Sequence, residues 1–333
     1  MTKASNSLIM RVERVSMNWH SDLPIFASES FLREVGDEYG WIGATDSSGK
    51  LRCILPYTVI KKAMFRMVRF RVETIPIGGE LTVEEEKLFL NEVVDYFRSN
   101  GVDMIVPATT NSIFRTYPKG ALAAPYGTYI IDLGEPEDKI WGRIHGRNRN
   151  KIRKAMKNGV EIRNGLEYLD VAYELVRATL MRSKLSFMSR DAFRRMILGL
   201  GENVKIFVAF YQDKVQGCAV LPYSRHSAYS VYAGSILKPE DGATKLLHWV
   251  SMRMFRELGV RRYDFVGARI NPEKGSKQER LAQYKRHLGG SLVQGYMWKY
   301  SIRPARYAFY ALAVRFLRGG DIVDHERHKM SYA

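Results

Sequence analysis

The sequence predicts two α/β domains in tandem, each with a mixed central sheet flanked by helices. Three observations lead to this prediction: the chain length, a long-period internal repeat, and a strongly basic segment between the two copies of the repeat. The 333 residues are enough for two ordinary domains of about 150 residues each. Hydrophobic residues make up 46% of the chain and charged residues 26%, which is typical of soluble globular proteins with full-sized cores.

The first part of the repeat is a pair of strands joined by a short polar turn. Residues 41–58 read WIGATDSSGKLRCILPYT, and residues 207–224 read FVAFYQDKVQGCAVLPYS. Both segments end in Leu-Pro-Tyr followed by Thr or Ser. The turn residues Asp46–Gly49 and Gln212–Asp213 are of the kinds that hairpin turns favour. We therefore expect one β-hairpin in each copy.

The second part of the repeat is an amphipathic helix followed directly by a strand. Residues 89–106 read FLNEVVDYFRSNGVDMIV, and residues 247–266 read LHWVSMRMFRELGVRRYDFV. Gly101 and Gly259 stand where a helix commonly ends in a left-handed residue. Generic hairpin and helix signals would explain either segment alone. Two matched segments in the same order, about 160 residues apart, indicate a duplication.

The order of hairpin, helix and strand resembles the core of the GNAT acyltransferase fold. In that fold, a splayed central sheet holds an acyl donor beside an amine acceptor. The resemblance implies two tandem GNAT-like domains, with residues 1–140 on the acceptor side and residues 141–300 on the donor side. The second range includes a basic joint at 141–160, and residues 301–333 would form a basic amphipathic helix and tail.

Charge and cysteine content restrict the partners and the compartment. The 52 Lys and Arg residues against 35 Asp and Glu give a net charge of +17 and favour binding to polyanions, although a generally basic soluble protein would show the same surplus. Cys53 and Cys218 lie far apart in apolar surroundings, which is typical of reduced core thiols. The segment 1–15 lacks the apolar region of a signal peptide. We expect a cytoplasmic protein, and peripheral contact with the inner face of the membrane stays open as an alternative.

The basic joint reads WGRIHGRNRNKIRKAMKNGVEI over residues 141–162. Helical spacing predicts that Ile140, Ile144, Ile152 and Met156 face the protein, and that Arg149, Arg153 and Lys157 form one exposed row. Like charges at this spacing repel one another, so the row is better explained if phosphates bind there than if it is only a solvated face. The candidate ligands for tRNA or other phosphates are Arg147, Arg149, Arg153 and Lys154.

The same joint resembles the signature that opens the second domain of FemAB-type transferases. The resemblance continues through SVYAGS at 230–235, GVRRYDF at 259–265, and YKRHLGG at 284–290, which is close to the Phe-Lys-x-x-Phe-Gly-Gly pattern of that family. It covers about residues 140–300. It implies an enzyme that moves amino acids from aminoacyl-tRNA to peptidoglycan precursors, with UDP-linked or lipid-linked acceptors.

Amide formation of this kind needs orientation of both substrates, removal of a proton from the amine, and stabilisation of charge on the carbonyl oxygen. It needs no covalent intermediate. The chain accordingly has no Gly-x-Ser-x-Gly and no His-Glu-x-x-His motif. We expect no metal and no resident cofactor, with aminoacyl-tRNA as the co-substrate.

Three residues are candidates for catalysis. The resemblance places Lys285 near the acyl ester of the donor, where a cation would stabilise developing charge or hold terminal phosphates. Tyr232 should lie at the end of a central strand, where it can hydrogen-bond a substrate or simply be half-buried. Asp264 is a candidate base or amine ligand, and the alternative is a carboxylate that caps a turn.

Further residues are candidates for acceptor binding. Family members have a basic and aromatic stretch that faces the nucleotide-sugar part of the acceptor, and the matching segment 182–193 offers Lys184 and Arg190 as diphosphate ligands. This chain lacks the tyrosine-rich variant of that stretch. Arg286, next to Lys285, is a third candidate.

Two other functions stay open at this point. The chain could be a GNAT-type N-acyltransferase that uses acyl-CoA or an acyl carrier protein in polysaccharide or secondary-metabolite synthesis. The loop 238–245, where the pyrophosphate of CoA would bind, has one glycine and two acids and is a poor anion site. A non-catalytic RNA-binding protein is the second alternative. The apolar, arginine-containing segment 303–318 fits either a helix docked on the domains or one that lies on a membrane surface.

Overall fold

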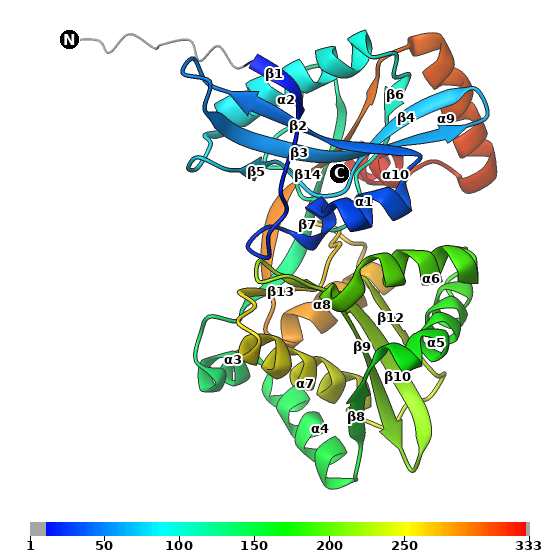
Figure 1. Ribbon diagram of the computed structural model, residues 1–333. Helices are drawn as coiled ribbons and strands as arrows, with labels where there is room; N and C mark the ends of the chain where they lie inside the picture. The colour runs from blue at the N-terminus through cyan, green and yellow to red at the C-terminus, as the bar shows by residue number, and fades with distance from the viewer. Residues whose placement is uncertain (1–10, 331–333) are drawn as a thin grey trace. The chain divides into compact units, whose positions relative to one another are not determined.

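The computed structural model describes residues 11–330, apart from the side chains of Arg318 and Met330. Most of the segment that we examined for a signal peptide therefore lies outside the described residues. Within the described range the chain divides into two compact units (Figure 1). The first domain comprises residues 11–19, 35–127 and 294–330, and the second comprises residues 20–34 and 128–293.

Neither domain is a single stretch of sequence, which differs from the contiguous ranges that we expected. The segment 20–34 packs on the second domain, where the ring of Phe26 lies 4.8 Å from that of Tyr229 and the Ser224 hydroxyl donates to the carbonyl of Leu23 at 2.7 Å. Two long strands, β7 (Leu122–Asp132) and β14 (Ser291–Ser301), continue from one domain into the other. The assignment of acceptor and donor sides to the domains stays a prediction.

The first domain is a mixed sheet with helices. Its strands follow the order β1-β2-β3-β4-β6-β14-β7. Besides β7 and β14 they are β1 (Arg11–Val15), β2 (Glu38–Thr45), β3 (Leu51–Lys62), β4 (Phe65–Phe70), β6 (Met104–Ile105) and β5 (Ile75–Pro76), which pairs with β3. The helices are α2 (Val83–Ser99), α9 (Pro304–Arg318) and α10 (Ile322–Met330).

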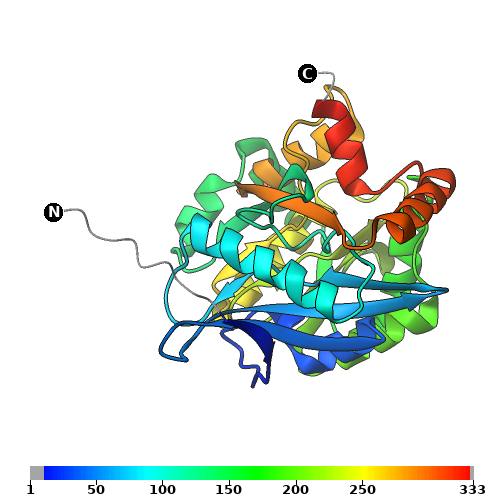
Figure 2. The same ribbon diagram turned by 90° about the horizontal axis from the view of Figure 1, so that it is seen from above.

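Helix α2 covers one face of this sheet (Figures 1 and 2). It begins with a capping box, in which the Thr82 hydroxyl accepts from the Glu85 N–H at 3.1 Å and the Glu85 carboxylate accepts from the Thr82 N–H at 2.7 Å. Its apolar side chains then recur at helical spacing and bury against the sheet. The helix ends just before Gly101, whose φ of +70° fits the predicted left-handed position.

The second domain has two groups of strands. The strands β7, β13 (Arg262–Asp264) and β11 (Ala228–Tyr229) are neighbours in one sheet, and a separate four-stranded sheet has the order β12-β10-β9-β8. The bounds of the latter are β8 (Glu161–Asn164), β9 (Val204–Tyr211), β10 (Lys214–Pro222) and β12 (Tyr232–Ser235). The helices are α1 (Glu29–Val35), α3 (Glu137–Arg143), α4 (Gly146–Lys157), α5 (Leu169–Met181), α6 (Arg190–Gly199), α7 (Ala243–Glu257) and α8 (Lys277–His287).

The repeat predicted from the sequence is confirmed in both domains. Strands β2 and β3 form one antiparallel hairpin, and β9 and β10 form the other. In the second hairpin Gln212 and Asp213 have φ values of +48° and +55°, as a two-residue hairpin turn requires. Helix α7 is followed at Gly259 (φ +73°) by the strand β13. The predicted fold class, tandem α/β domains with mixed sheets, is therefore correct.

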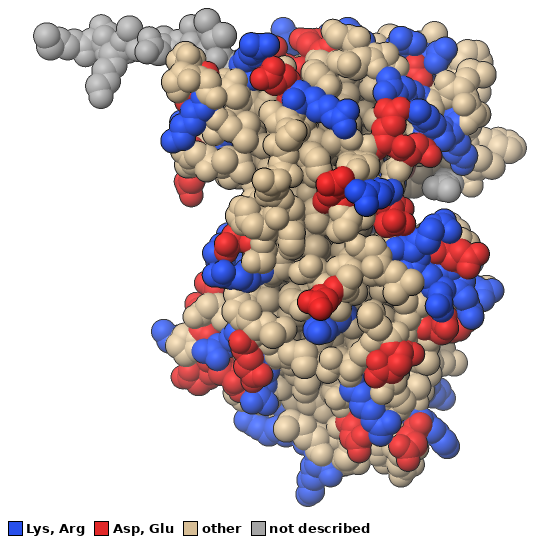
Figure 3. All heavy atoms as spheres, viewed as in Figure 1, with Lys and Arg blue, Asp and Glu red and all other residues tan. Residues whose placement is uncertain are grey.

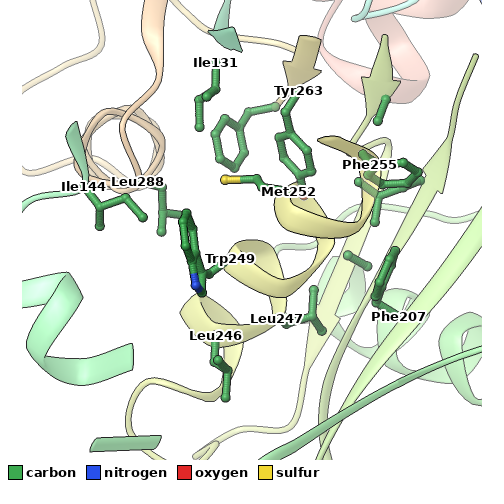
Figure 4. Packing of buried hydrophobic residues seen from close by; sticks show 14 of the residues in the cluster. Ile131, Ile144, Phe207, Leu246, Leu247, Trp249, Met252, Phe255, Tyr263 and Leu288 are labelled. Atoms are coloured by element: carbon green, nitrogen blue, oxygen red, sulfur yellow. The ribbon is translucent and has the colours of Figure 1, made fainter. Parts of the chain in front are cut away.

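The core of the second domain forms around α7 (Figure 4). Figure 4 shows Trp249 beside Leu288 and Ile144, and Met252 beside Tyr263 and Ile131. Burying apolar side chains of this size stabilises a fold by about 1.5–3 kcal/mol each. Cys53 and Cys218 are both buried and free, and burial raises the pKa of each thiol to about 12, as expected for unreactive core residues.

The carboxyl-terminal helices pack on the first domain. The buried carboxylate of Asp103 accepts a hydrogen bond from the Arg306 guanidinium at 3.1 Å. It also lies 3.4 Å from the Arg303 guanidinium. The Lys299 ammonium, on β14, donates to Asp321 at 2.8 Å and to Asp324 at 2.5 Å. None of the helices within residues 11–330 combines the length and apolarity that crossing a membrane requires.

Candidate active site

A fork between two strands defines the candidate site in the second domain. Strand β11 runs parallel to β13, with Tyr229 opposite Asp264, and the Ser230 N–H donates to the Asp264 carbonyl at 2.8 Å. Two residues further on, the chain leaves β13, and β12 pairs instead with β10, with Tyr232 opposite Val220. The strands separate just beyond Asp264. Such an opening leaves backbone groups available to a ligand, as in the splayed sheet that the sequence predicts.

Asp264 is held in the base of this fork by fixed donors. Its side chain is 4% exposed and accepts from the Thr128 hydroxyl on β7 and from the Val266 N–H at 2.7 Å. Burial raises the pKa of the carboxyl to about 6, while the hydrogen bond from Thr128, the Val266 N–H and the charge of Lys285 oppose that rise. The carboxyl therefore changes protonation state near neutral pH, which suits proton transfer.

Lys285 reaches the same place from α8. Its ammonium donates to the carbonyls of Val266 and Gly267, the latter at 2.6 Å. Burial lowers the pKa of this lysine to about 8, and the charge of Asp264 limits the decrease. The fork thus combines a buried carboxyl and a partly buried ammonium that are both ionised between about pH 6 and 8.

The carbonyls that hold Lys285 belong to an unusual stretch of backbone. Val266 has φ +42° and Gly267 has φ +49°. A left-handed conformation is a true outlier for a β-branched residue and costs on the order of 1–3 kcal/mol. Because this strain directs two carbonyls at one ammonium, we interpret it as part of the site and not as a loop irregularity.

Behind the fork lies a buried cluster of three polar side chains that the sequence did not predict. The His248 Nδ1 on α7 lies 2.7 Å from the Tyr263 hydroxyl, and Ser251 lies 3.2 Å from the same hydroxyl. Burial lowers the pKa of His248 to about 4, so the ring is neutral at pH 7. Thr128 was missed as well. No local pattern marks it, because it meets Asp264 only through the pairing of β7 with β13.

Tyr232 lies on the other arm of the fork. Its ring contacts Phe187 at 5.2 Å and Phe193 at 5.9 Å between centroids, which places it against the connection between α5 and α6. Tyr232 begins β12, which stands at one end of the order β12-β10-β9-β8, so the prediction of a central strand was wrong. The contacts are also those of a half-buried aromatic residue, so a substrate-binding role stays a prediction.

The three residues predicted to bind the acceptor are less well placed for binding a phosphate than Asp264 and Lys285 are for catalysis. The Arg190 guanidinium, at the start of α6, bonds to Glu174, lies 3.8 Å from Asp170, and stacks over the Tyr173 ring at 5.3 Å. A phosphate at Arg190 would have to displace these carboxylates. Lys184 is exposed and has a left-handed backbone with φ +56°. Arg286 is exposed and donates to the Tyr129 hydroxyl at 3.3 Å.

The basic joint is not the single helix that its spacing predicts. It breaks between α3 and α4 at Ile144 and His145, and the His145 side chain caps α4 by accepting from the Arg147 N–H at 3.3 Å. Ile140, Ile144 and Ile152 are buried as predicted. The prediction for Met156 was wrong, since it is 55% exposed near the carboxyl end of α4.

The four phosphate candidates on α4 differ in their availability. Arg149 donates to the carbonyls of Gly142 at 2.8 Å and Ile144 at 2.7 Å, so its guanidinium satisfies the end of α3. Arg153 is exposed and stacks on Trp141 at 5.4 Å, while Arg147 and Lys154 are exposed. Figure 3 shows Lys and Arg side chains spread over the viewed face and not gathered in one patch. Arg147, Arg153 and Lys154 remain the candidate contacts.

The amino terminus of α7, where a CoA pyrophosphate would bind in a GNAT domain, is covered by α4. Gly242, with φ +91°, lies so close that a Cβ there would stand 2.2 Å from the Lys151 carbonyl oxygen. Asp241 accepts from the Lys151 ammonium at 2.9 Å, and Glu240 accepts from the Asn158 amide at 2.8 Å. Two acidic residues and the helix α4 therefore stand where the pyrophosphate of CoA would bind.

Comparison with known proteins agrees with this architecture. Residues 145–286 match a family model described as "Acetyltransferase (GNAT) domain", so the chain carries the acyltransferase domain that the sequence predicts. No curated protein matches the sequence significantly.

Two solved structures share the fold. A crystal structure of FemX has a TM-score of 0.64 at 15% identity and covers 86% of this chain and 93% of its own. The C-terminal domain of a putative lysylphosphatidylglycerol synthetase from Agrobacterium fabrum has a TM-score of 0.52 at 15% identity, with 86% and 91% covered. The predicted likeness to FemX-type proteins is confirmed at the level of the fold.

Proposed function

We propose that the protein transfers an aminoacyl group from aminoacyl-tRNA to an amine of a cell-wall precursor or a similar acceptor. The observation that carries the proposal is that Val266 links two ionisable groups at the strand fork of the GNAT domain: its N–H donates to the Asp264 carboxylate and its carbonyl accepts from the Lys285 ammonium. The covered amino terminus of α7 favours a donor other than acyl-CoA. The fold shared with FemX agrees with the choice of aminoacyl-tRNA, and the net charge of +17 suits a polyanionic donor.

In this proposal the amine nitrogen attacks the ester carbonyl carbon, a C–N bond forms, and the C–O bond to the ribose breaks. Asp264 accepts the proton from the attacking amine. The Lys285 ammonium stabilises the oxygen on which negative charge develops. The proton removed from the amine ends on the ribose hydroxyl that leaves. Tyr232 orients the substrate from the opposite arm, while Lys184, Arg190 and Arg286 serve acceptor binding and Arg147, Arg153 and Lys154 contact the tRNA backbone.

Incubation with charged tRNAs, and separately with acyl-CoAs, tests the donor. Mass spectrometry should show that aminoacyl-tRNA is consumed and that an acceptor gains an aminoacyl mass. Consumption of acyl-CoA instead would support the alternative of a GNAT-type N-acyltransferase, for which the family description is the favouring observation. Tight, salt-sensitive RNA binding without transfer from either donor would indicate a non-catalytic RNA-binding protein.

The pH dependence of transfer should be bell-shaped. Asp264 must be ionised to accept a proton, so the rate should rise with pH through about 6. Lys285 must be protonated to stabilise negative charge, so the rate should fall above about 8. Single-turnover rates from pH 5 to 9 measure both limbs.

The variant Asp264→Asn separates this explanation from the ionisation of the acceptor. Asparagine cannot titrate, so the inflection near pH 6 should disappear from the residual activity. Deprotonation of the acceptor amine itself would produce an inflection that Asp264→Asn leaves in place. If the acidic limb is unchanged in the variant, Asp264 is not the base.

A further inference from the structure

Helix α9 presents an apolar stripe to solvent. Phe309, Leu312, Phe316 and Leu317 are 70%, 68%, 90% and 76% exposed. Phe309, Leu312 and Phe316 are spaced by three and four residues, so they share one side of the helix, and Leu317 extends the exposed surface beside them. A cluster of large exposed apolar side chains is uncommon on a soluble domain and marks an interaction surface.

The orientation of α9 is fixed by the contacts of Tyr307, Tyr310 and Arg306. Tyr307 and Tyr310 pack against a cluster that contains Met67, Met104 and Val106. The Arg306 guanidinium reaches Asp103, and it also donates to the Met64 carbonyl at 3.1 Å. Because polar and aromatic anchors hold the inner side, rotation of the helix cannot bury the stripe.

The stripe extends beyond α9 itself. Met64, at the turn between β3 and β4, is 68% exposed and adjoins α9 through the bond from Arg306. Exposed cations, Lys62 and Arg315, accompany these apolar side chains. In Figure 3, uncharged side chains project at the edge of the first domain where Figure 1 places α9. We call the set Met64, Phe309, Leu312, Phe316 and Leu317 the α9 surface.

A groove adjoins the α9 surface between α9 and α10. Its volume is about 820 Å³, and Ala308, Ala311 and Leu312 line it together with Arg315, His325 and Arg327. The volume lies within the range of pockets that hold small molecules and lipid groups. The lining combines apolar side chains with Arg315 and Arg327, and it also contains the Asp324 carboxylate, so it suits an acyl chain beside a phosphate bound by arginine.

We propose that the α9 surface docks the protein on a bilayer that contains anionic phospholipid. Large apolar side chains flanked by Lys and Arg are the composition of helices that lie in the membrane interface. Arg303 and Arg306 pair with Asp103, which leaves the exposed cations Arg315 and Lys62 to face phosphate headgroups beside the apolar side chains. This docking surface lies on the first domain and does not depend on the transfer reaction proposed for the second.

Vesicle flotation with the full chain tests the proposal. The protein should float with vesicles that contain phosphatidylglycerol and should remain at the bottom with phosphatidylcholine alone. The double variant Leu312→Gln, Phe316→Gln should bind the anionic vesicles at least about tenfold more weakly, because two side chains no longer enter the interface. Both positions are exposed, so circular dichroism and thermal unfolding should match the native chain.

Two controls make the result specific. The matched variant Leu88→Gln, Leu198→Gln alters exposed leucines on α2 and α6, which are 50% and 55% exposed, and should bind as the native chain does. Phe316→Trp keeps an interfacial aromatic residue and should also retain binding. The proposal is overturned if anionic vesicles do not bind, or if the glutamine variant binds unchanged. A shift of that variant from dimer to monomer in light scattering, without loss of vesicle binding, would overturn it in favour of a second copy of the chain.

Discussion

Replacing Lys285 by alanine should lower the rate of aminoacyl transfer by at least about 100-fold, because removing one group that stabilises the developing oxyanion typically costs that much. The ammonium is the cation that the carbonyls of Gly267 and of the strained residue Val266 hold at the fork. The loss should appear in kcat and leave tRNA binding, measured by filter retention, nearly unchanged. Lys274→Ala is a matched control, since it removes an exposed lysine from the loop before α8.

A structural defect must be separated from a chemical one. Alanine at 285 leaves the buried Asp264 without its neighbouring positive charge, so the variant can also lose stability. A second variant, Lys285→Cys, can be alkylated with bromoethylamine to restore an amine at nearly the same length. The two native thiols are buried, which limits alkylation to position 285. Recovery of transfer after alkylation would support a role for the ammonium. Full activity of Lys285→Ala with aminoacyl-tRNA would contradict the proposed mechanism.

Local sequence patterns predicted correctly those features whose conformation is decided by residues close together in the chain. The hairpin turns at Asp46–Gly49 and Gln212–Asp213 and the helix ends near Gly101 and Gly259 form as predicted, because turn chemistry and left-handed glycine act within a few residues. The hydrophobic spacing also placed Ile152 in the core correctly. These elements were sufficient to predict the fold class.

Contacts between distant segments could not be predicted in the same way. The segment 20–34 joins the second domain through Phe26 and Leu23, and no local pattern signals that exchange. The joint breaks at His145 because a side chain caps α4 there, and a regular helical spacing does not reveal a cap of that kind. The role of Arg149 at the end of α3 follows from that break. Burial of Asp264 and its bond from Thr128 likewise require the pairing of β13 with β7.

The carboxyl-terminal pair of helices depends on one buried charge. The side chain of Lys299 is 3% exposed, and its ammonium pairs with Asp321 and Asp324 at the start of α10 and also hydrogen-bonds Tyr307 on α9. Burial by itself would lower the pKa of Lys299, but the two carboxylates outweigh it and raise the pKa above its usual range. The two acids, together with the hydrogen bond to Tyr307, therefore keep the ammonium ionised inside the first domain.

The double variant Asp321→Ala, Asp324→Ala should lose about 3–5 kcal/mol of unfolding free energy, because it leaves a buried charge without a counter-charge. Urea unfolding monitored by circular dichroism measures the loss. Asp95→Ala breaks the exposed ion pair with Arg98 on α2 and should cost less than about 1 kcal/mol. Adding Lys299→Met to the double variant removes the uncompensated charge and should restore most of the stability. If the double variant is as stable as the native chain, the bonds to Lys299 do not hold α10, and the groove beside the α9 surface must be maintained by apolar packing alone.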